Sequence, residues 1–302
     1  MSTANRPYVT YLNFGEGVIT VIAQSICICS MGHLLYCAAV AKNRANLPKL
    51  STSIIVFLAT QTILHASCLP YHIYMMIFWR GSVNNYDTNV LFCLGISTVM
   101  LITVQPVPVF FLTLDRCLVL KMPLRYTGTF QRWIVAASIV TIVSVWIVSL
   151  ASTLVELPLP VEKLRNCALF SCLLLKSKAY VAQTLKIIFG TTNLLASIYF
   201  LYALRTAKAD LKNRVVKITL IVEMCLNLFP TYVVQLFNII VGETWGSYFG
   251  NTQVMCCTCE AAFCGLFYSK VFLKQNVLDK AHVPGFFTTS IKQCTISQSR
   301  EA

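Results

Sequence analysis

An acid and a base stand side by side where a long apolar run of the sequence ends, in the stretch PVFFLTLDRCLVLKMPLRY at 108–126. The guanidinium of Arg116 keeps its charge and offers five hydrogen-bond donors, so close to a membrane it must find acceptors. Asp115 is the nearest acceptor along the chain. Two interpretations stay open here. The pair exchanges partners as part of a mechanism, or Arg116 is simply a positive anchor at a membrane surface.

Further ionisable side chains lie inside apolar segments, where they are costly and by default point to function. Lys186 is about seven residues into its segment, roughly 10 Å deep, and Glu260 lies near the middle of the last one. In one interpretation, Lys186 and Glu260 face a pocket and bind a polar or charged group of a ligand. Snorkelling of the Lys186 amine and an internal hydrogen bond of Glu260 are the alternatives. His72 is a third candidate for the same ligand pocket, although the aromatic residues near it are equally typical of a membrane interface.

The elements that carry these side chains are predicted to be membrane-spanning helices. The chain has 302 residues, of which 57% are hydrophobic and 12% are charged, about half the charged share of an ordinary soluble domain. A helix needs about 20 apolar residues to cross the hydrocarbon layer. Seven such segments are expected, at residues 17–41, 51–78, 90–114, 133–157, 179–204, 218–241 and 252–273. The predicted fold class is therefore an all-α membrane protein, a seven-transmembrane helix bundle.

The net charge of +13 is distributed in a way that favours membrane orientation over nucleic-acid binding. Of the 24 Lys and Arg residues, six lie on one side of the predicted membrane and 17 on the other, at 42–50, 115–132, 205–217 and from 270 onwards. Basic residues concentrate on the cytoplasmic side. We therefore expect 1–16 to be a short extracellular N-terminus, 17–273 to be the seven-helix domain and 274–302 to be a cytoplasmic tail.

Cysteines accompany the acid–base pair at the other end of its segment. Cys93 begins the segment that Asp115 and Arg116 end, and Cys167 and Cys172 lie in the second outer loop. Together with a proline several residues after the arginine, this set resembles the rhodopsin-like G-protein-coupled receptors. More narrowly, the short chain, the sparse N-terminus and the stretch LTLDRCLVLKMPLRY resemble the nematode serpentine chemoreceptors of class BC.

The resemblance implies a chemosensory receptor in the plasma membrane of a sensory cilium, binding an odorant or pheromone-like small molecule. Arg116 would engage a heterotrimeric G protein, and Asp115 would restrain that arginine in the resting state. A disulfide bond would join Cys93 to Cys167 or Cys172, with Cys167 favoured because apolar residues follow Cys172. No cofactor, metal, enzymatic activity or nucleic-acid partner is expected, and membrane lipid is the remaining partner.

The chain also departs from the family pattern. The stretch LFPTY around Pro230 resembles the family's proline kink, and a helix hinge is expected there because proline removes a backbone hydrogen bond. Glu223 is the one acid of that segment placed to approach the arginine, but it lies too deep in the membrane, so its role is left open. Pro106 and Pro108 are expected to open the backbone ladder of the third segment. Either Gln105 or a neighbouring helix must then satisfy the freed carbonyls.

Three other functions also use seven spanning segments. An intramembrane zinc hydrolase needs several His or carboxylate ligands, whereas no histidine lies in the third to seventh predicted segments. A ligand-gated channel with inverted topology disagrees with the distribution of basic residues. A small transporter is expected to show two similar halves, and none is evident. The channel and the transporter are therefore kept as alternatives behind the receptor.

Overall fold

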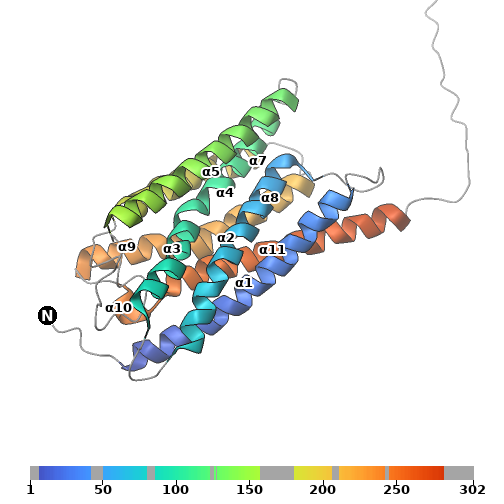
Figure 1. Cartoon of the computed structure of the whole chain (residues 1–302). Coiled ribbons are helices and arrows are strands. Elements are labelled where there is room, and N and C mark those ends of the chain that lie inside the picture. Colours follow the sequence, from blue (N-terminus) through green and yellow to red (C-terminus); the bar gives the residue numbers. More distant parts are fainter. Residues whose placement is uncertain are drawn as a thin grey trace, which may run out of the picture.

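A computed structural model of the chain describes residues 7–41, 50–79, 86–122, 126, 128–156, 180–205, 211–241 and 245–281. Within these ranges the regular structure is helical, and no strand occurs. Figure 1 shows the helices packed as one elongated bundle in which long rods run side by side. Such a bundle satisfies its backbone hydrogen bonds within each helix, which is what a lipid environment demands.

The helices in the described part of the chain follow one another in this order: α1 (Pro7–Ala41), α2 (Thr52–Ile77), α3 (Thr88–Val104), α4 (Pro106–Lys121), α5 (Gly128–Glu156), α7 (Tyr180–Arg205), α8 (Leu211–Glu223), the π-helix η1 (Met224–Leu228), α9 (Phe229–Val241), α10 (Gly246–Phe249) and α11 (Thr252–Ala281). Among the described residues, seven helical stretches are long and apolar enough to cross a membrane. Two of them are composite, since α3 continues into α4, and α8 continues through η1 into α9. The predicted all-α seven-helix class is confirmed, and the orientation of the termini stays a prediction.

Several helices extend beyond the apolar segments from which they were predicted. Helix α1 begins at Pro7, well before the expected start at residue 17, and α11 continues to Ala281. The third spanning stretch runs on to Lys121, so Asp115 and Arg116 lie within the last turns of α4 rather than beyond its end. A helix satisfies its own backbone, and for that reason it persists past the hydrocarbon layer into the polar interface.

The interior of the bundle is built around α1, α2, α4 and α11. Helix α1 lies along both α2 and α11, whereas α4 packs against α7, α5 and α2. Buried aromatic side chains pack between these helices. For example, the rings of Phe57 and Tyr268 have centroids 5.9 Å apart. Large apolar side chains such as Trp133 and Val155 on α5 are 71% and 81% exposed. An exposed apolar surface of this kind fits contact with lipid.

Two spanning stretches contain irregular backbone next to prolines. Gln105 separates α3 from α4 but keeps helical dihedral angles, φ −51° and ψ −42°, so the rod continues across Pro106. In the sixth stretch, η1 ends two residues before Pro230, and the Phe229 N–H donates to the carbonyl of Met224. A π-helical turn of this kind is a recognised local irregularity in helices and often accompanies functional sites. A hinge at Pro230 stays a prediction.

Candidate functional site

Asp115 and Arg116 lie buried at the end of the bundle where α4 ends and α2 begins. Their exposed fractions are 1% and 5%. The Arg116 Nη2 is 3.3 Å from the Asp115 Oδ2, and it donates a hydrogen bond of 2.5 Å to the hydroxyl of Ser51. Among the described residues, Asp115 is the ion-pair partner of Arg116, and Glu223 is not. The guanidinium is therefore held inside the bundle by its sequence neighbour and by the start of α2.

Tyr126 adds a second contact to the carboxylate of Asp115. Its hydroxyl donates a hydrogen bond to the Asp115 Oδ1, and its ring packs edge-on against Phe130 with centroids 5.8 Å apart. Burial, and then the hydrogen bond to Asp115, raise the pKa of the Tyr126 phenol above its ordinary value of 10.0. The phenol is therefore a hydrogen-bond donor throughout the physiological pH range, and Asp115 is bound by both Arg116 and Tyr126.

A contact between α8 and α11 closes this end of the bundle. The hydroxyl groups of Thr219 and Tyr268 are hydrogen-bonded at 2.9 Å. Both side chains are buried, and Tyr268 lies close enough to Arg116 to interact with it electrostatically. Arg116 thus lies among α2, α4 and α11, and α8 is joined to this group through Tyr268. With 5% of its surface exposed, Arg116 is closed off from the outside of the bundle in this arrangement.

Ser51 and Tyr126 are functional candidates that the sequence did not single out. Ser51 occupies the N-cap position of α2, a position that favours serine because its hydroxyl accepts from the first backbone N–H groups. Here it makes no such cap bond, and its hydroxyl accepts from Arg116 instead. A serine ahead of an apolar helix is visible in the sequence, but its choice between backbone and arginine depends on how α2 and α4 approach each other.

Gln105 joins the α3–α4 junction to α11 in the middle of the bundle. Its Nε2 donates to the Glu260 carboxylate at 2.5 Å and to the carbonyl of Cys257 at 3.4 Å, and the Cys257 thiol donates to the Gln105 Oε1. All three residues are fully buried. Both polar groups of the amide are used between helices. Gln105 therefore does not satisfy the carbonyls freed by Pro106 and Pro108, since its amide donates to Glu260 and Cys257. The alternative, a neighbouring helix, stays a prediction.

Lys186 and Glu223 complete a buried polar cluster around Glu260. The Glu223 Oε1 accepts from Asn227 at 3.0 Å and from Asn193 at 3.4 Å. The carboxyl groups of Glu223 and Glu260 face each other, and the Lys186 amine lies near Glu223. The Lys186 Nζ is buried and has no hydrogen-bond partner among the described residues. Two of the three predicted ligand-pocket residues, Lys186 and Glu260, thus both lie near Glu223 in the bundle interior.

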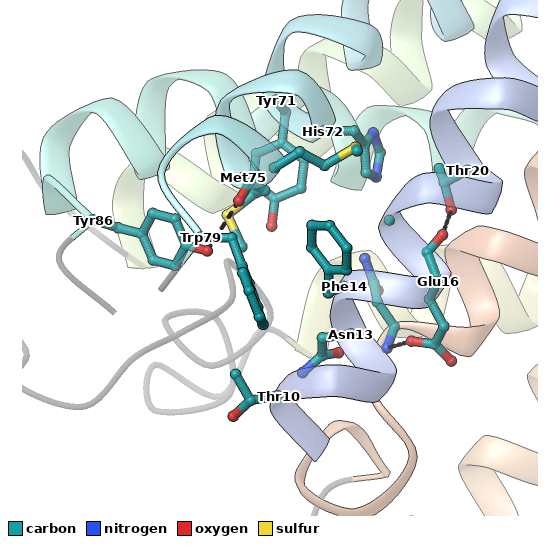
Figure 2. Close-up of a pocket in the computed structure, with 13 residues that line it drawn as sticks. Thr10, Asn13, Phe14, Glu16, Thr20, Tyr71, His72, Met75, Trp79 and Tyr86 are labelled. Atoms are coloured by element: carbon teal, nitrogen blue, oxygen red, sulfur yellow. Dashed lines mark hydrogen bonds between the residues drawn. The ribbon is translucent and has the colours of Figure 1, made fainter. Parts of the chain in front are cut away.

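A cavity of about 40 Å³ lies at the other end of the bundle, between the start of α1, the end of α2 and the chain just before α11. Figure 2 shows its walls. Phe14, Tyr71, Met75, Met76, Trp79 and Tyr86 contribute aromatic and thioether side chains, and Thr10, Asn13, Glu16, Thr20, His72 and Asn251 contribute polar ones. Helix α2 begins beside Arg116 and ends at this cavity, and its 26 residues span about 39 Å. The two sites therefore lie at opposite ends of the bundle.

Of the three predicted pocket residues, His72 lines this cavity, whereas Lys186 and Glu260 do not. A role of the latter two in ligand binding stays a prediction. Cys93 lies near the start of α3, exposed and without a disulfide bond to any described cysteine. Its predicted partners Cys167 and Cys172 fall outside the described residues. The predicted disulfide bond therefore stays a prediction as well.

Glu16 ties α1 to the start of α11 beside the cavity. Its carboxylate accepts from the backbone N–H of Asn251 and from the hydroxyl of Thr252, both at 2.6 Å. A carboxylate is stabilised at a helix N-terminus by the free N–H groups and the helix dipole. Gly250 has φ 72°, and a Cβ there would overlap the Glu16 carboxylate and the side chain of Asn13. A Gly-Asn-Thr sequence ahead of an apolar run indicates a helix start, but its distant partner Glu16 was missed.

The described residues contain no group of three or more His, Cys, Asp or Glu side chains placed to share a metal ion. The chain matches no family model, and no curated protein is significantly similar to it. The bundle has three features that bear on function, which are the buried arginine at one end, the cavity at the other and the polar cluster between them.

Proposed function

We propose that this protein is a seven-helix chemosensory receptor, which binds a small molecule outside the cell and activates a heterotrimeric G protein inside it. One observation supports this most. A single bundle carries an apolar-walled cavity at one end and, about 39 Å away along α2, a buried arginine held by a salt bridge and hydrogen bonds. The sequence resemblance adds the class, a nematode serpentine receptor, and the place, the plasma membrane of a sensory cilium.

In the proposed mechanism, the contacts of Arg116 define the resting state. Asp115 and Ser51 hold the guanidinium between helices, and Tyr126 fixes the carboxylate of Asp115. In the active state the ends of α7 and α8 move outward, and Arg116 turns towards the G protein. A ligand that binds this active arrangement more tightly shifts the population towards it, by no more than its difference in affinity for the two states.

The polar cluster offers a physical connection between the two ends. Gln105, Lys186, Glu223 and Glu260 come from the α3–α4 junction, α7, α8 and α11. Displacing one partner of a buried polar contact leaves the other group without a hydrogen bond, which is unfavourable in free energy. The cluster therefore favours discrete arrangements of these helices over a continuous range, which is what a switch between two states requires.

Membrane orientation is the first test, because a G protein can meet Arg116 only in the cytoplasm. A glycosylation sequon is placed near Asn85 and, in a separate protein, near Gln298, and each is expressed in cells. We expect the first to be glycosylated and the second not. The reverse result would put Arg116 outside the cell and would contradict the receptor function.

Coupling is the second test, and it needs no ligand. The receptor in lipid nanodiscs is incubated with a nucleotide-free heterotrimeric G protein, and the complex is measured by co-purification. We expect Arg116→Ala to lose the complex. Arg132→Ala, which removes an exposed arginine at the start of α5, is expected to retain it. Equal binding by the two variants would remove Arg116 from the proposed mechanism.

A small transporter is the second candidate, and the buried cluster is the observation that favours it. Ionisable residues inside spanning helices mark ion and proton pathways in many membrane proteins. Lys186, Glu223 and Glu260 form such a group. The test is proton flux into liposomes that contain the purified protein. A flux abolished by Glu260→Gln would favour the transporter over the receptor.

A further inference from the structure

The orientation of the His72 ring determines what its second nitrogen can do. The His72 Nδ1 lies 3.1 Å from the carbonyl oxygen of Cys68, one helical turn earlier in α2. A carbonyl oxygen can only accept a hydrogen bond, so Nδ1 carries the hydrogen. In the uncharged ring, the Nε2 then has a free lone pair and is an acceptor.

This acceptor is buried and unsatisfied. His72 is 4% exposed, and its Nε2 has no hydrogen-bond partner among the described residues. His72 also forms no ion pair in the described part of the chain. An unpaired buried imidazolium would be unfavourable, which supports the uncharged ring. A buried acceptor without a donor is itself unfavourable, and in native proteins such groups usually have a bound partner.

The missing donor has room to bind in the cavity, which His72 lines. Figure 2 shows the ring of His72 on the side of α2 that faces α1, with Phe14 below it. The rings of Phe14 and Trp79, which also line the cavity, have centroids 4.6 Å apart. Two buried acceptors without a donor among the described residues belong to lining residues, the Nε2 of His72 and the Oδ1 of Asn13. Largely apolar walls with a few polar groups are typical of small-molecule sites.

The cavity offers little to a cation. Glu16 is the carboxylate that lines it, and both of its oxygens already accept hydrogen bonds from the start of α11, through Asn251 and Thr252. A positively charged ligand would therefore compete with the helix N-terminus for the same carboxylate. A neutral donor to His72 has no such competitor.

We propose that the cavity binds a small neutral molecule with a hydroxyl group on an apolar body, such as a phenol or a short alcohol. The hydroxyl donates to the His72 Nε2, and the apolar body packs against Phe14, Met75 and Trp79. The inference rests on the proposed function, because it names the chemical class of the ligand. It deepens that function without using its G protein.

The test compares two probes that differ in the donor alone, 4-fluorophenol and its methyl ether 4-fluoroanisole. Saturable binding to the full-length protein in nanodiscs is measured by fluorine NMR, with empty nanodiscs to subtract partition into lipid. We expect the phenol to bind about 10-fold more tightly than the ether, the ratio that the net contribution of one ordinary hydrogen bond gives. Equal affinities, or saturable binding of neither probe, would overturn the proposal.

Three variants assign the preference to His72. His72→Phe is expected to lose the discrimination between phenol and ether, and His72→Gln is expected to keep part of it, because the Gln carbonyl is an acceptor. His65→Phe changes another buried histidine of α2 that does not line the cavity, and it is expected to keep the discrimination. A preference that survives His72→Phe would overturn the proposal. If a variant fails to fold, the two-probe comparison on the unmodified protein still decides the ligand class.

The outcome is independent of G-protein coupling. Loss of coupling with intact phenol preference would reject the proposed function and leave the site standing. Intact coupling without phenol preference would reject the ligand class and leave the receptor standing.

Discussion

The hydrogen bond from Arg116 to Ser51 makes the strongest prediction about the resting state. In Ser51→Ala the arginine loses a contact of 2.5 Å to α2 and keeps its salt bridge to Asp115. We expect ligand-independent activity to rise, because the lost contact belongs to the resting arrangement.

The size of the effect follows from the burial of the contact. Arg116 is 5% exposed, and a hydrogen bond made by a buried charged group contributes about 1.5–3 kcal/mol in soluble proteins. Between membrane helices the average is about 0.6 kcal/mol and the maximum about 1.7 kcal/mol. A loss of about 1–1.5 kcal/mol changes an equilibrium roughly 5- to 12-fold. A receptor that is active about 1% of the time would then be active roughly 5–10% of the time.

The assay is the rate of guanine-nucleotide exchange on a heterotrimeric G protein, measured without ligand in nanodiscs. Ser53→Ala is the matched control. Ser53 lies two residues further along the chain and is buried, and its hydroxyl has no hydrogen-bond partner among the described residues. Equal basal rates for Ser51→Ala and Ser53→Ala would refute the idea that α2 restrains the arginine.

Three further changes test contacts near the two ends of the bundle. Glu16→Ala removes two hydrogen bonds to α11 and is expected to lower the free energy of unfolding by about 1–3 kcal/mol, measured by thermal unfolding in detergent. Gly250→Ala is expected to lower it by about 1–3 kcal/mol, the cost for alanine of a backbone conformation that is essentially restricted to glycine, because φ is 72° and ψ is −146°. The new Cβ also overlaps Glu16. Tyr126→Phe is expected to remove one late-titrating tyrosine signal from an absorbance titration. Since folding raises the pKa of this phenol, its contribution to stability is constant below about pH 10 and is lost as the pH rises through the folded-state value.

Each of these changes has a control and a contradicting outcome. Glu16→Gln keeps one acceptor and should lose about half as much stability as Glu16→Ala, so equal losses would argue against a cap. Gly32→Ala adds a Cβ where nothing lies within 4 Å and should stabilise the protein by about 0.5–1 kcal/mol. A similar gain at Gly250 would contradict the strained turn. For Tyr126→Phe, a stability difference from the unmodified protein that changes between pH 6 and pH 9 would contradict the phenol remaining protonated.

The number and approximate positions of the spanning helices were predictable from the sequence. Transfer into lipid is a nearly additive property of each segment, so an apolar run of sufficient length is recognisable without its neighbours. The proximity of Asp115 and Arg116 was also predictable, because adjacent residues at the end of one helix remain adjacent in any packing. The ends of α1 and α11 were less predictable, since a helix continues into the interface where hydropathy no longer marks it.

The partners of the buried polar groups were decided only by the tertiary structure. Gln105 bonds Glu260, and Glu16 caps the start of α11 at Asn251, across more than 150 and 230 residues of chain respectively. In a lipid environment nearly every face of a spanning helix is apolar, so the sequence hardly indicates which side turns inward. Helix rotation and neighbour choice therefore determine that Lys186 faces Glu223 and that the free nitrogen of His72 lies at a cavity. Those two properties arise from packing among all seven helices at once, and no single segment contains them.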